Sequence, residues 1–111
     1  MLKRNERSLE SYLKAGAEMR LYKAVITRLA IDISTVISAA DQDRLLDTAS
    51  KVARICSRAE DKMFADYPEL SGEYLDVFYG PLNDTPRNDV DRQVVEMARE
   101  AADGLFERKT D

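Results

Sequence analysis

Pairs of acidic residues are the features of this chain whose types and spacing could do chemistry. Glu73 and Asp76 are three positions apart and Glu96 and Glu100 are four apart, so each pair would share one face of a helix. Carboxylates placed in this way on adjacent helices can bind Mg²⁺ or Mn²⁺. The 111 residues include no histidine, which removes the usual zinc and di-iron bundle sites, the hydrolase triads and histidine acid-base catalysis.

These acidic pairs form an incomplete enzyme motif. Glu73 to Asp76 and Glu100 to Asp103 are similar to the second half of the Glu-x-x-Glu, Glu-x-x-Asp pattern of all-helical nucleotide pyrophosphatases, but the first half is missing. The only cysteine, Cys56, interrupts an apolar seam, which is typical of a small buried hydrophobe rather than a nucleophile. We therefore expect no catalytic residues, no metal site and no cofactor.

The composition is that of a single globular domain spanning residues 1 to 111. Hydrophobic residues make up 44% and charged residues 34%, with a formal net charge of −4. A single cysteine excludes an intrachain disulfide and fits a reducing cytoplasm. We expect neither a signal peptide nor a membrane span, because the N-terminus has no apolar h-region and no apolar run approaches 18 residues.

Apolar periodicity predicts an all-α fold, an antiparallel bundle of three main helices plus one short helix. Apolar residues recur every three or four positions over residues 8 to 40, which predicts a first helix about 50 Å long. A seam over residues 45 to 63 predicts a second helix, and because the two seams are out of phase we expect a break near Asp41, its N-cap. Ser71 should cap the short helix, and Thr85 the last one, with proline at its first position.

Five of the eight aromatic residues fall between Phe64 and Tyr79, around the least regular part of the backbone. Rings in such a segment could line a small pocket beside a polar loop. The same rings could instead close one end of a three-helix core, and this is the interpretation that we prefer.

The first helix carries a second, thinner apolar row behind its main core face. A surface helix with one buried side should not carry such a row, and a domain of this size has only a modest core of its own. We therefore predict a non-catalytic protein-protein interaction module that forms a homodimer through this helix. The residues of this partner row are Leu13, Ala17, Leu21, Ala24 and Ile31.

A basic stripe on the second helix favours an alternative function, a small regulator that binds nucleic acid or another polyanion. Its residues lie within roughly 80° of one another on the helix: Arg44, Lys51, Arg54, Arg58 and Lys62. The negative net charge and the lack of interleaved aromatic residues weigh against nucleic acid. The last helix carries an acidic stripe that a basic one could face, in the same chain or in a second chain: Asp89, Glu96, Glu100, Asp103 and Glu107.

Overall fold

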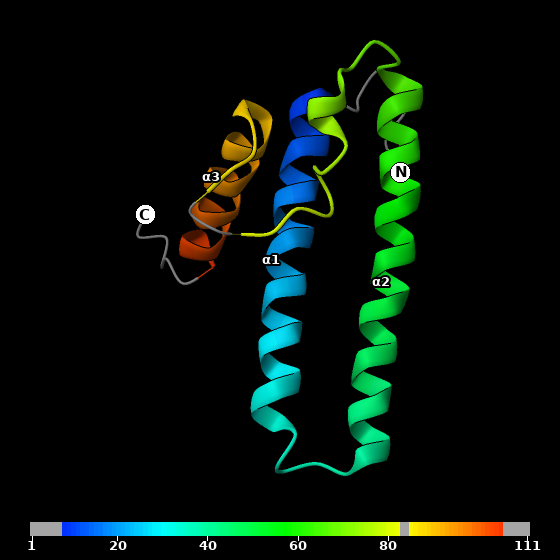
Figure 1. The fold of residues 1–111 in the computed structure, drawn as a ribbon, viewed down its shortest axis with the longest axis vertical. Helices are drawn as coiled ribbons and strands as arrows, with labels where there is room; N and C mark the ends of the chain where they lie inside the picture. Colours follow the sequence, from blue (N-terminus) through cyan, green and yellow to red (C-terminus); the bar gives the residue numbers. More distant parts are fainter. Residues whose placement is uncertain (1–7, 83–84, 106–111) are drawn as a thin grey trace, which may run out of the picture.

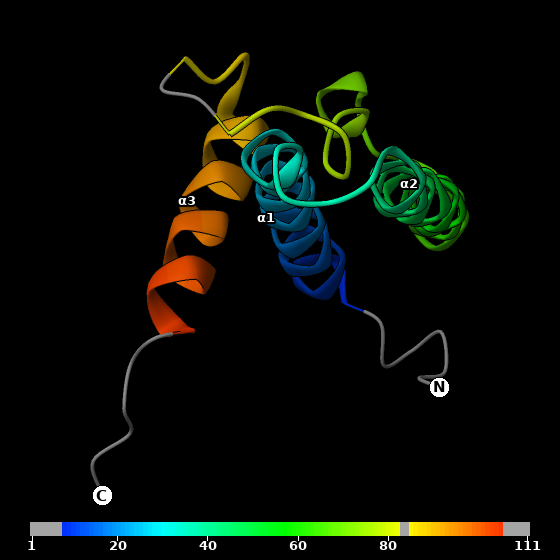
Figure 2. The same ribbon diagram turned by 90° about the horizontal axis from the view of Figure 1, so that it is seen from below.

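The computed structural model describes residues 8–82 and 85–105 and confirms the all-α fold. The described elements are α1 (Leu9–Ile33), α2 (Ala39–Asp66), the single 3₁₀ turn η2 (Gly72–Tyr74) and α3 (Asp89–Gly104). α1 lies between the other two helices, with α2 antiparallel beside it and α3 on its opposite side (Figures 1 and 2). None of the described helices is long and apolar enough to cross a membrane.

The segment between α2 and α3 crosses only one face of this arrangement. Residues 75–82 pass over α1 on the side that is uppermost in Figure 2, and within residues 8–82 and 85–105 no other segment between the helices crosses α1 on the opposite side. The fold is therefore an open layer in which α1 contacts both neighbours while part of its own surface faces outward.

The first helix is shorter than predicted. α1 ends at Ile33 rather than at residue 40, so its length at about 1.5 Å per residue is about 38 Å. The predicted break before the second helix is present, but Ser38 replaces Asp41 as the cap, because its Oγ accepts a hydrogen bond from the Asp41 N–H at 3.1 Å. The β-branched residues before Ser38 weaken helix formation, which moves the break toward the N-terminus.

The last helix begins later than predicted, at Asp89 rather than beside Thr85. Asn88 caps α3 by accepting a hydrogen bond from the Asp91 N–H at 2.8 Å. Asparagine is a better cap than threonine, and carboxylates in the first turn suit the positive end of the helix dipole. Ser71 caps the short helix as predicted, although that helix is a single 3₁₀ turn.

The core lies toward one end of the layer, where the N-terminal half of α1 meets α2, α3 and the 75–82 segment. Its largest fully buried side chains are Phe78, Met63, Val77, Val94 and Cys56. The other aromatic residues of the segment pack against this core. The aromatic segment therefore packs against the core, as the preferred interpretation expects, while Tyr67 and Tyr79 also line shallow hollows at the surface.

Candidate interaction surface

The structure divides the predicted partner row between the core and the surface. Leu13 is 4% exposed and Ala17 is completely buried, because α3 of the same chain packs against α1. Assigning these two residues to a partner surface was therefore wrong, since they belong to the chain's own core. Leu21 is half-buried, whereas Ala24 and Ile31 are exposed.

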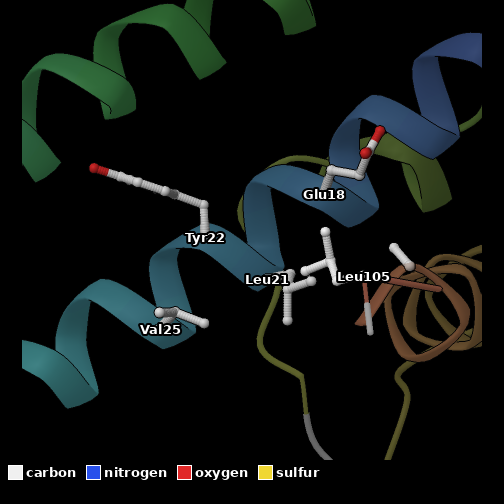
Figure 3. A pocket seen from close by; sticks show the side chains of 6 residues that line it. Glu18, Leu21, Tyr22, Val25 and Leu105 are labelled. Carbon is white, nitrogen blue, oxygen red and sulfur yellow. The ribbon is translucent and has the colours of Figure 1, made fainter. Parts of the chain in front are cut away.

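An adjoining face of α1, which shares Leu21 with the predicted partner row, is open and apolar. Figure 3 shows Leu21, Tyr22 and Val25 projecting from α1, with Leu105 of the α3 cap beside Leu21. Val25 is 57% exposed, Leu29 41% and Leu105 72%. We call these five residues the open face.

Two shallow hollows run along the open face. The first has a volume of about 300 Å³ and is bounded by Glu18 and Leu21 on α1 and by Ala101 and Leu105 at the end of α3. The second, of about 410 Å³, continues along α1 as far as Asp32. Val25 lines both hollows, so the open face is continuous over more than half of the helix.

On another side of α1 lies a buried ion pair that the sequence analysis missed. Arg20 is 2% and Asp91 3% exposed, and Nη1 of Arg20 lies 2.5 Å from Oδ1 of Asp91. The same guanidinium donates through Nε to the Val77 carbonyl at 3.0 Å and through Nη2 to the Asp76 carbonyl. Arg20 thereby ties α1 to the start of α3 and to the segment that precedes it.

Asp91 is held in its charged form. Desolvation by burial raises its pKa, but the Arg87 N–H, which donates to Oδ2 at 3.0 Å, and the Arg20 guanidinium together outweigh burial and leave the pKa below the usual aspartate value. Every buried side-chain nitrogen and oxygen of the described residues has a hydrogen-bond partner. This cluster is therefore a satisfied structural clamp.

Close packing of glycine accompanies the clamp and was the signal available in the sequence. A Cβ built on Gly16 would lie 2.5 Å from Val77 Cγ1, and one on Gly80 would lie 2.6 Å from Arg20 Cζ. A glycine inside a helix, on the same side as an arginine one turn later, leaves room for another backbone segment to approach the helix there.

The acidic pairs do not converge. Glu73, Glu96 and Glu100 are exposed, and the described residues contain no group of three or more acidic or cysteine side chains that could hold a metal ion. Asp76 instead accepts a hydrogen bond from Arg87 Nη1 at 2.5 Å.

Cys56 is a buried side chain, as predicted. Its thiol donates to Met19 Sδ at 3.2 Å. Desolvation by burial raises the pKa of the thiol despite the opposing charge of Lys23 and a hydrogen bond from the backbone. A raised pKa lowers the thiolate fraction, so this environment does not activate a nucleophile.

The charged stripes lie on α2 and α3, which are on opposite sides of α1 (Figure 2). All five residues of the basic stripe are exposed on α2, where Arg44 pairs with Asp41 and Lys51 with Asp47, both at 3.2 Å. The acidic stripe is exposed on α3, apart from Glu107, which lies outside the described residues. Because α1 separates α2 from α3, the described parts of the stripes do not face each other within one chain (Figure 2).

The open face is thus the candidate functional surface that the geometry favours. It combines exposed apolar side chains from α1 and the end of α3 in one continuous strip, which is typical of an interaction site. Comparison with protein-family models, curated proteins and solved structures finds no match for this chain.

Proposed function

We propose that this protein is a non-catalytic helical interaction module that forms a homodimer through its open face. The observation that carries the proposal is the exposure of Val25, Leu29 and Leu105 along two joined hollows. Exposed apolar side chains that adjoin one another along a helix favour a protein-binding site over an ordinary solvated face. A single buried cysteine fits a module that works in the reducing cytoplasm.

A second copy is a suitable partner for energetic reasons. Complete burial of an exposed valine or leucine side chain stabilises an assembly by about 1.5–3 kcal/mol. In a dimer with twofold symmetry every residue of the open face is buried twice, once in each chain. A small apolar patch therefore contributes twice its own burial energy to the stability of the dimer. A chain with a modest core gains additional stability from such an assembly.

The substitution Val25→Glu tests the proposal, because Val25 is 57% exposed and its replacement leaves the monomer core intact. Wild-type protein at tens of micromolar should show about twice the 12.6 kDa chain mass in light scattering or sedimentation. The variant should show the chain mass, because each dimer would bury two carboxylates in apolar surroundings. Far-ultraviolet circular dichroism should show unchanged helix content.

Ile31→Glu is the matched control. Ile31 is 63% exposed on the same helix but lies roughly 120° around the helix axis from Val25, outside the open face. This variant should remain dimeric. A monomeric wild-type protein would refute the proposal, and so would dissociation caused by Ile31→Glu but not by Val25→Glu.

A further inference from the structure

A row of residues along α1, which we call the central row, passes through the open face, and in this row charged residues flank two apolar ones. The row follows the 4-3-4-3-4 spacing that keeps residues on one side of a helix and forms the seam of paired helices. It consists of Lys14, Glu18, Leu21, Val25, Arg28 and Asp32. The order of the row is basic, acidic, apolar, apolar, basic, acidic. If the row of a second copy runs in the opposite direction, every basic residue lies opposite an acidic one and each apolar residue lies opposite an apolar one.

We propose that two copies of this chain pack their α1 helices antiparallel along the central row, about a twofold axis at the level of residue 23. Lys14 then faces the partner's Asp32, Glu18 faces the partner's Arg28, and Leu21 faces the partner's Val25. The twofold axis produces each of these pairs a second time. This arrangement rests on the proposed homodimer and specifies its orientation and register.

The charged residues of the row are accessible for such pairing. All four are exposed, and Glu18, Arg28 and Asp32 line the two hollows of the open face. Neither Lys14 nor Glu18 forms an ion pair with another described residue. Arg28 and Asp32 are bonded at 3.1 Å with side chains 78% and 58% exposed, and an exposed pair exchanges partners at little cost.

A parallel arrangement of the same faces is disfavoured by charge. Each residue of the row would then lie beside its own copy, so that Lys14 would meet the partner's Lys14 and Glu18 the partner's Glu18. Like charges in contact are destabilising, whereas the antiparallel register places opposite charges at all four charged positions. Charge complementarity therefore selects a second copy in antiparallel orientation as the occupant of the open face.

Charge reversal with rescue tests the register. Asp32→Lys places two like-charged pairs in the dimer and should raise its dissociation constant about tenfold, which corresponds to about 1.4 kcal/mol. Adding Lys14→Asp in the same chain should restore the wild-type constant. Within one chain these positions are 18 residues apart, about 27 Å along α1, so such a rescue can only arise between chains.

Sedimentation equilibrium over a dilution series at low ionic strength measures these constants where exposed pairs are least screened. Asp61→Lys, the same charge change at an exposed position on α2, is the control and should leave the constant unchanged. A dimer that Val25→Glu dissociates but in which Lys14→Asp fails to rescue Asp32→Lys would overturn the antiparallel register and leave the homodimer standing. A monomeric wild-type protein would overturn both.

Discussion

Replacing Arg20 by alanine should be among the most destabilising single changes in this protein. The guanidinium is the cationic partner of the buried Asp91 carboxylate and a donor to the carbonyls of Val77 and Asp76. Removing one member of a buried pair costs about 3–5 kcal/mol, because it leaves an uncompensated charge inside the protein. Because Asp91 keeps the hydrogen bond from the Arg87 N–H at 3.0 Å, we expect Arg20→Ala to lower the free energy of unfolding by about 3 kcal/mol.

Urea unfolding monitored by far-ultraviolet circular dichroism measures this change. The free energy of unfolding of an ordinary domain is about 5–15 kcal/mol in total. A loss of this size should therefore lower the urea concentration at the unfolding midpoint strongly. Arg44→Ala is the matched control: Arg44 also pairs with an aspartate, but its side chain is 81% exposed, so the change should cost less than about 0.5 kcal/mol.

The double variant Arg20→Ala with Asp91→Asn separates lost charge compensation from lost packing. When Asp91 is already replaced by asparagine, removing the guanidinium leaves no uncompensated buried charge. The double variant should therefore lose less unfolding free energy than the two single variants lose in sum. If Arg20→Ala costs as little as Arg44→Ala, the clamp does not hold α3 against α1 and the reasoning is refuted.

Two further predictions concern the same region. Gly16→Ala should destabilise the fold by about 1–3 kcal/mol despite the better helix propensity of alanine, because the Val77 backbone oxygen would lie 2.6 Å from the new Cβ. The control Gly104→Ala should not destabilise the fold, because the space around Gly104 is open. Equal effects of the two variants in thermal unfolding would count against the close approach of the Val77 backbone to α1. Because the pKa of Asp91 is lowered in the folded chain, the stability it contributes is complete above the ordinary aspartate pKa of about 3.9 and is lost as the pH falls below it. The difference in unfolding free energy between wild type and Asp91→Asn should therefore begin to narrow at about pH 5 and continue to narrow as the pH falls through the lowered pKa of Asp91. A constant difference would contradict the assignment.

The three α-helices and their order could be predicted from the sequence because the periodicity that shows them is local. The exact ends of the helices could not be predicted as well, because several residues that make good N-caps lie close together in the sequence. Ser38 competes with Asp41, and Asn88 competes with Thr85; in each case the structure uses the residue that the sequence analysis did not choose. The choice depends on where the chain must turn to bring the helices together.

By itself the sequence determined that α1 has more apolar surface than one buried side requires. Only the tertiary structure decided which part of that surface remains open. Leu13 and Ala17 are buried in the core where α3 packs against α1, and the ion pair at this contact, Arg20 with Asp91, joins positions 71 residues apart. Periodicity along one helix carries no information about contacts between residues so far apart in the sequence. The exposure of Val25 and Leu29 therefore follows from the positions of α2 and α3 in the tertiary structure.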